Sequence, residues 1–160
     1  MDRRYAFSLR APRAIAVAAF GFFMLASASA AQGPAKKSLY ERLGGYDAIS
    51  AVVEDFAPKL FSDPRVGRFF VGMSADSRAQ FKQKNKNLVC SVTGGPCQII
   101  SRPAKTAHAG LGITDEDFAV VVGHLVGTLK KFGVPKAEQD ELLAIVGSLK
   151  PDIVEKSSKE

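Results

Sequence analysis

Apolar residues recur at the three- and four-residue spacing of an α-helix along most of this chain, and this spacing constrains its fold more than any other feature. One such face is formed by Ile49, Val52, Val53, Phe56 and Leu60. Another is formed by Phe118, Val121, Val122, Leu125, Val126 and Leu129. No segment shows the apolar and polar alternation of a half-buried strand. The sequence therefore predicts an all-α fold.

Capping and breaking residues predict where the first helices begin and end. Ser38 and Glu41 have the spacing of a capping box, so we expect a short helix through Leu43, ended by Gly44-Gly45. Proline lacks a backbone N–H and clashes with the preceding turn, so Pro58 should bend or end the helix over residues 49–60. Asp63-Pro64 should then start a short helical turn ending at Phe69-Phe70.

The later helices show the same signals. A long helix over residues 74–93 should turn four apolar residues inward, with Asn85 completing their stripe: Phe81, Leu88, Val89 and Val92. Thr114 should cap the next helix, whose first turn is acidic. A last helix should begin near Pro135, bury Leu142, Ile145, Val146 and Leu149, and stop at Pro151.

The first thirty residues have the pattern of an export signal. A basic start is followed by an apolar stretch and by Ala28-Ser29-Ala30, which suits cleavage after Ala30. The apolar stretch is shorter than the ~20 residues that a membrane span needs. We therefore expect a signal peptide at 1–30, a disordered leader at 31–37, one domain at 38–154 and a tail at 155–160, in a protein exported to the periplasm as a monomer or small oligomer.

The charge pattern argues against nucleic-acid binding. The chain has a formal net charge of +6, but residues 1–30 hold four arginines and one aspartate, so the remainder carries about +3. The basic residues Lys82, Lys84 and Lys86 lie within one predicted helix and have no aromatic residues between them. A nucleic-acid interface would need a clustered basic patch, so we expect no nucleic-acid partner and, after signal cleavage, no membrane partner.

The two cysteines, Cys90 and Cys97, flank a Gly-Gly-Pro turn. In an oxidising compartment such a pair can persist as a disulfide, although geometry rather than sequence decides whether it forms. The chain lacks the Cys-x-x-Cys-His motif that attaches haem through thioether bonds.

Residues 94–113 follow no helical or strand period, and they contain four glycines and two prolines. A long segment without structure inside a compact domain usually has a function. Near its end lies His108, one of only two histidines. A lone histidine is more often a surface or hydrogen-bonded residue, but one neutral imidazole is also enough to hold haem iron. The other histidine, His124, borders an apolar helix face and is better explained by packing.

Five ordered motifs together resemble those of group I truncated haemoglobins. They are residues 38–45, residues 52–56, Asp63-Pro64-Arg65-Val66 with Phe69-Phe70, residues 93–96 and residues 108–114, and the likeness spans about 38–154. This resemblance implies a shortened globin fold, a two-on-two helical sandwich in which an extended loop mostly replaces the usual proximal helix. It also implies a non-covalent b-type haem and O₂, NO or CO as ligand.

The resemblance also assigns roles to single residues. It makes His108 the proximal iron ligand and Phe70 the aromatic residue at the haem edge. Arg102 and Lys105 are candidate partners of the haem propionates, and Phe56, Phe81, Asn85 and Leu88 are expected to line the haem. The distal side departs from the family pattern, because Ala57 stands where members commonly have tyrosine and Asn85 where glutamine is common. We therefore expect weaker retention of bound O₂.

Two questions stay open at the level of sequence. Some members of the family fill the distal iron position with a side chain from this turn of the helix, so Lys84 is a possible distal ligand, although a solvated lysine is the simpler interpretation. We expect an oxygen-binding or oxygen-transport protein rather than an enzyme. The alternatives are a haem redox protein with NO dioxygenase-like, peroxidase-like or electron-transfer activity and a reductase partner, or a haem-free helical interaction domain.

Overall fold

The computed structural model describes residues 36–156. The predicted signal peptide, most of the predicted leader and residues 157–160 lie outside the described residues. Every named element of the described chain is a helix, and the only extended pairing there is an isolated bridge between Thr114 and Lys156. Within residues 36–156, no helix combines the length and the apolar character needed to cross a membrane.

The first helix begins as predicted, whereas the second begins at Gly45 and runs past its proline. Helix α1 spans Leu39–Arg42 and carries the Ser38 and Glu41 capping box. Helix α2 spans Gly45–Ser62 and contains Pro58 in its interior, so of the two effects expected of Pro58, a bend or an end, the helix does not end there. The Ser62 hydroxyl donates to the Pro58 carbonyl at 2.9 Å, and Leu60 is buried, so packing and side-chain hydrogen bonds retain the last turn.

Asp63 begins the connection to the next long helix. Its carboxylate accepts the backbone N–H groups of Arg65 and Val66 at 2.8 and 3.0 Å, which is the capping role predicted for it. The 3₁₀ helix η1 follows over Gly67–Phe70, and α3 spans Ala75–Val92 with Ser74 as its cap. The predicted short turn and the predicted long helix are both confirmed.

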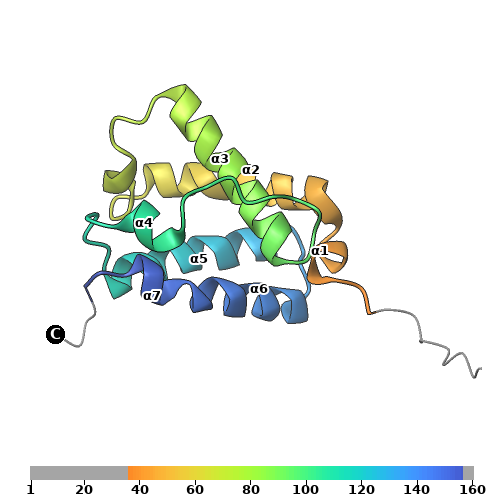
Figure 1. The fold of residues 1–160 in the computed structure, drawn as a ribbon. Helices are drawn as coiled ribbons and strands as arrows, with labels where there is room; N and C mark the ends of the chain where they lie inside the picture. The colour runs from red at the N-terminus through yellow and green to blue at the C-terminus, as the bar shows by residue number, and fades with distance from the viewer. Residues whose placement is uncertain (1–35, 157–160) are drawn as a thin grey trace, which may run out of the picture. The chain divides into compact units, whose positions relative to one another are not determined.

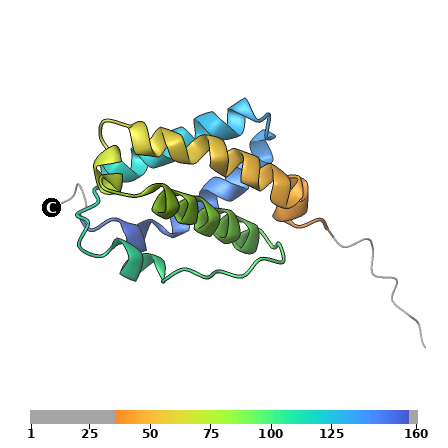
Figure 2. The same cartoon turned by 90° about the horizontal axis from the view of Figure 1, so that it is seen from above.

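The segment expected to lack regular structure contains one helical turn, α4, over Ala104–His108. Pro103 precedes it, and its fixed φ suits the start of a helix. Before α4, the chain from Gly94 runs back along α3, as both Figure 1 and Figure 2 show. The absence of an apolar period in a single turn explains why the sequence pattern missed α4.

The last three helices are α5 over Asp115–Lys131, α6 over Lys136–Ser148 and α7 over Lys150–Ile153. Pro151 does not stop the helical region as predicted, because it lies in the first turn of α7, where its missing N–H has no helical partner to lose. Leu142 is buried, whereas Ile145, Val146 and Leu149 are half-buried.

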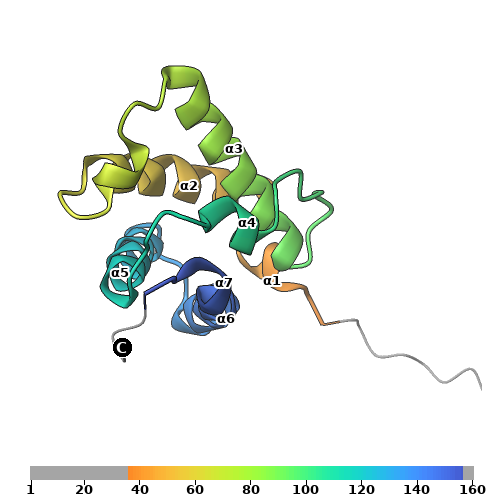
Figure 3. The same ribbon diagram turned by 60° about the vertical axis from the view of Figure 1, so that its left-hand side comes forward.

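The long helices form two layers. Figure 3 shows α2 and α3 on one side and α5 and α6 on the other. Helix α3 packs chiefly on α2, and α4 chiefly on α7. Buried residues form three clusters, of which the one nearest the aromatic residues contains Phe56, Leu60 and Val66. The predicted all-α architecture is confirmed.

Candidate functional site

His108 is the last residue of α4 and is half-buried. Its Nδ1 lies 2.8 Å from the carbonyl oxygen of Ala104, one turn earlier in the same helix. A carbonyl only accepts hydrogen bonds, so this contact places the proton on Nδ1 and leaves the Nε2 lone pair available. Within the described chain Nε2 has no hydrogen-bond partner. In the neutral imidazole, Nε2 is therefore the nitrogen left free to bind a metal.

An aromatic cluster connects η1 with α2 and α3. The ring centroids of Phe61, Phe70 and Phe81 lie 5.1 to 5.5 Å apart in edge-to-face pairs, the arrangement that aromatic quadrupoles favour. Phe70 and Phe81 are among the residues that the sequence predicts at the site, whereas Phe61 is not. Phe61 lies five residues after Phe56, so it is not on the helical face from which the site was predicted. The guanidinium of Arg78 also lies over the Phe61 ring.

Phe56 and Ala57 come from the side of α2 that faces the core. Phe56 is 9% exposed and belongs to the buried cluster on which Phe70, Phe81 and Leu125 pack. Ala57 is fully buried at 0% exposure. A residue larger than alanine at position 57 would have to displace neighbouring side chains.

The α3 side of the site holds Phe81, Asn85 and Leu88, which are all half-buried. The Asn85 side-chain nitrogen donates to the Phe81 carbonyl at 2.8 Å, so part of its donor capacity is used within its own helix. Cys90 is the buried residue of this helix. Because α3 packs chiefly on α2, its apolar side chains at positions 81, 88 and 92 are only partly covered by other helices.

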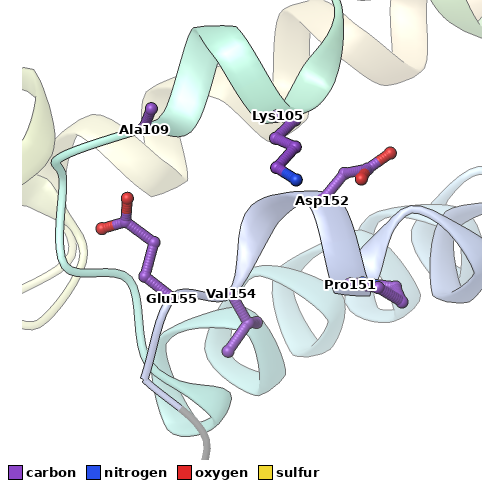
Figure 4. Close-up of a pocket in the computed structure, with 6 residues that line it drawn as sticks. All are labelled: Lys105, Ala109, Pro151, Asp152, Val154 and Glu155. Atoms are coloured by element: carbon purple, nitrogen blue, oxygen red, sulfur yellow. The ribbon is translucent and has the colours of Figure 1, made fainter.

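Of the two predicted propionate partners, Arg102 precedes α4 and Lys105 belongs to it. Arg102 is exposed in the segment before α4. Lys105 is exposed on α4 and lines a hollow of about 300 Å³ between α4 and α7, together with Asp152 and Glu155. Figure 4 shows the Lys105 side chain extending over α7 toward Asp152. Neither Arg102 nor Lys105 forms an ion pair within residues 36–156, and both side chains are exposed.

Lys84 is exposed on α3 and forms no ion pair within residues 36–156. Its neighbours Lys82 and Lys86 both pair with Glu54 of α2, at 2.6 and 2.7 Å. Lys82 and Lys86 therefore contribute to the contact between α2 and α3.

His124 Nε2 lies 2.7 Å from the Asp63 carboxylate. The hydrogen bond from His124 and the backbone N–H of Val66 lower the pKa of Asp63 to about 2. This contact ties α5 to the turn that precedes η1. His124 is thus engaged in a structural contact, in agreement with the packing role predicted for it.

Asp117 organises a charged cluster that sequence reasoning missed. It is 1% exposed and accepts hydrogen bonds from Arg65 at 2.9 Å and Arg68 at 2.7 Å, as well as from Thr114. Burial raises the pKa of Asp117, but the hydrogen bonds from Thr114, Arg65 and Arg68 outweigh it, so the net pKa is lowered. In the sequence, the acidic first turn of α5 is explained by the helix dipole. The signal that could have singled out Asp117 is its capping-box spacing from Thr114.

A disulfide joins Cys90 at the end of α3 to Cys97 in the following segment. Gly95 lies against this link, and a Cβ there would come within 2.7 Å of the Cys90 carbonyl and sulfur. The disulfide therefore fixes where the chain leaves α3 on its way to α4.

Comparison with known proteins gives consistent likenesses. A family model described as bacterial-like globin matches residues 38–155. The chain is 34% identical over 116 residues to the group 1 truncated hemoglobin GlbN of Mycolicibacterium paratuberculosis, covering 72% of this chain and 83% of that protein. It is 30% identical over 115 residues to GlbN of Synechocystis, covering 69% and 90%.

Solved structures give the same picture. The truncated hemoglobin of Tetrahymena pyriformis in its Fe(III) form superposes with a TM-score of 0.70 at 27% identity, covering 75% of this chain and 100% of that one. The 2/2 hemoglobin of Synechococcus, in the cyanomet state and with covalently attached heme, superposes with a TM-score of 0.67 at 35% identity, with the same coverage.

Proposed function

Because this chain belongs to the bacterial-like globins, and among them to the group 1 truncated haemoglobins, we propose that it holds haem through His108 and binds O₂ or another diatomic gas reversibly. Family membership supports haem-based gas binding. The predicted family and the predicted two-on-two globin fold are both confirmed. The residue roles and the identity of the gas are proposals, argued below from the described side chains.

The residues present fit a haem. His108 offers Nε2 while its Nδ1–H is held by Ala104, and a hydrogen bond to the second ring nitrogen is the usual way to orient a histidine ligand. Phe81 and Leu88 present partly covered apolar surface along α3, which suits a flat apolar group. When bound, the haem iron supplies the coordination position for the gas.

Non-covalent attachment is supported by what occupies the other candidate linking residues. Cys90 and Cys97 are bonded to each other, so neither can form a thioether to a vinyl group. His124 is hydrogen-bonded to Asp63 through Nε2. We propose a b-type haem held by His108 and by apolar contacts, with Phe56, Phe70, Phe81 and Leu88 as the lining residues.

On the distal side we assign Asn85 as the polar residue of the site. Its amide can donate one hydrogen outward while the other remains bonded to the Phe81 carbonyl. With Ala57 in place of a hydroxyl-bearing residue, little else of α2 could stabilise bound O₂. The proposal is therefore a carrier that releases O₂ readily. Arg102 remains our candidate for a propionate, and Lys105 a weaker one because it extends over α7.

The observation that carries the proposal is the Nδ1 contact of His108, and its test is haem binding. Purified protein reconstituted with haem should show a Soret band with one haem per chain. His108→Ala should lose this band and regain part of it in imidazole, whereas the matched variant His124→Ala should retain it. Haem uptake by His108→Ala equal to that of the unsubstituted protein would refute the assignment.

A second measurement separates gas carriage from redox chemistry. The reduced, reconstituted protein should keep the spectrum of its oxygen complex for many minutes in air-saturated buffer. Prompt conversion to the ferric form would instead favour the redox alternative, with a reductase as its partner.

We also propose that residues 1–30 direct export and that the mature protein works in the periplasm. The Cys90 and Cys97 disulfide supports an oxidising compartment, since such bonds rarely persist in a reducing cytosol. Cell fractionation with an antibody against the protein tests this, together with N-terminal sequencing of the mature chain, which should begin at Ala31.

A further inference from the structure

We propose that Glu155 is a positioning residue for His108, acting through the backbone of the segment that follows α4. This inference rests on the proposed function, because it assigns a role relative to the histidine that would hold iron. Glu155 lies near the C-terminal end of the described chain, beyond the predicted end of the domain at Val154 and inside the predicted tail.

The Glu155 carboxylate clamps two backbone groups close to His108. One of its oxygens accepts the N–H of Gly110 and the other that of Gly112, both at 2.5 Å. These glycines lie two and four residues after the histidine. Figure 4 shows the Glu155 side chain rising from the C-terminal segment toward the chain that leaves Ala109. These two hydrogen bonds lower the pKa of Glu155, so the carboxylate is ionised at neutral pH and accepts both.

The backbone of the C-terminal segment adds a second set of contacts. The N–H groups of Glu155 and Lys156 donate to the Ile113 carbonyl at 2.9 and 3.2 Å. Ile113 is buried, so this pairing holds the end of the segment against the core. The Glu155 side chain therefore holds the backbone of the segment between His108 and the buried Ile113.

The segment over residues 109–112 has few other restraints. Gly110 and Gly112 have φ values of +81° and +64°, which glycine adopts without the usual Cβ penalty but also leaves easily. Residues 109–111 are exposed, and α4 packs chiefly on α7. A one-turn helix is too short to be stable alone. The position of α4, which carries His108, thus depends on contacts with the C-terminal segment, and the two hydrogen bonds of the Glu155 carboxylate are among them.

The first test reads the clamp itself and needs no haem. Hydrogen exchange of the haem-free protein, resolved to single amides by NMR, should show slow exchange at Gly110 and Gly112. Glu155→Ala should speed exchange at both amides, and Glu155→Gln should speed one, because an amide offers only one acceptor oxygen. Asp152→Asn is the matched control, since Asp152 lines the same hollow but forms no hydrogen bond to the loop. Exchange at α2 amides should stay unchanged, which verifies folding.

The second test measures how firmly His108 holds the haem iron. In the haem-reconstituted protein, Glu155→Ala should increase the rate of haem transfer to an acceptor globin by about tenfold, the lower end of the range for lost outer-shell support of a ligand. It should also broaden or shift the iron–histidine stretching band in resonance Raman spectra of the ferrous protein. Asp152→Asn should change neither quantity.

The outcomes distinguish the two proposals. If the amides at Gly110 and Gly112 lose protection in Glu155→Ala while haem transfer and the stretching band stay as in the unsubstituted protein, the positioning role is refuted and haem binding through His108 stands. If those amides are unprotected in the unsubstituted protein, the clamp itself is refuted. If His108→Ala binds haem normally, the proposed function fails whatever Glu155 does.

Discussion

The side-chain nitrogen of Asn85 lies 2.8 Å from the carbonyl oxygen of Phe81, so the amide that we propose for the distal side donates one of its two hydrogens to its own helix. This contact limits how far the amide can turn toward a bound gas. It stiffens the side chain at the same time, so the second hydrogen points in a nearly fixed direction.

The first prediction concerns O₂ release. We expect Asn85→Ala to speed O₂ dissociation by less than about tenfold, because one neutral hydrogen bond contributes about 1 kcal/mol and tenfold corresponds to about 1.4 kcal/mol. Laser photolysis with stopped-flow mixing measures the rate. Gln83→Ala on the exposed side of the same helix serves as control and should have no effect. An increase of a hundredfold or more in Asn85→Ala would mean that Asn85 acts as a strong donor.

The second prediction concerns iron coordination. Lys84 is exposed, and bringing its charged amine to the iron would require desolvation and loss of a proton. We therefore expect five-coordinate ferrous spectra in the unsubstituted protein, in Lys84→Ala and in the control Lys82→Ala. A six-coordinate low-spin spectrum that disappears only in Lys84→Ala would establish lysine ligation instead.

The third prediction concerns the disulfide. Closing the loop over residues 90–97 removes entropy from the unfolded chain, so Cys97→Ser should lower the free energy of unfolding by about 2 to 3 kcal/mol. Urea unfolding followed by circular dichroism measures the loss. The unsubstituted protein in reductant should approach the variant, and the variant should not respond to reductant. Equal stability of the reduced and oxidised forms would contradict this contribution.

The fourth prediction concerns Asp117. Its buried carboxylate accepts charge-assisted hydrogen bonds from Arg65 and Arg68 and caps α5 through Thr114. Asp117→Ala should therefore reduce stability by about 2 kcal/mol or more, measured by the same unfolding experiment. The neighbouring exposed residue offers a control, and Glu116→Ala should change stability by about 0.5 kcal/mol or less. Similar losses in both variants would argue against a special role for Asp117.

The fifth prediction concerns pH. The contact with His124 lowers the pKa of Asp63 from 3.8 to about 2, so ionised Asp63 stabilises the fold above pH 3.8 and this stabilisation is lost as the pH falls toward 2. Asp63→Asn should be less stable than the unsubstituted protein at neutral pH, and the difference should shrink below about pH 4. A gap for Asp63→Asn that persists unchanged to pH 2 would refute the linkage.

Sequence alone established most of the secondary structure of this protein. The spacing of apolar residues placed α2, α3, α5 and α6, and the capping residues Ser38 and Thr114 marked helix starts. These signals are local, because the three- and four-residue period and the cap both act within one or two turns. The five motifs also pointed to the family and, through it, to His108.

Only the tertiary structure decided how the site is held. The place of Phe61 in the aromatic cluster and the burial of Asp117 beneath Arg65 and Arg68 both depend on which segments meet in space. The Glu155 clamp joins residues 43 and 45 positions apart in the chain. Contacts between distant segments have no period or spacing in the sequence, because they arise from how packed helices bring loops together.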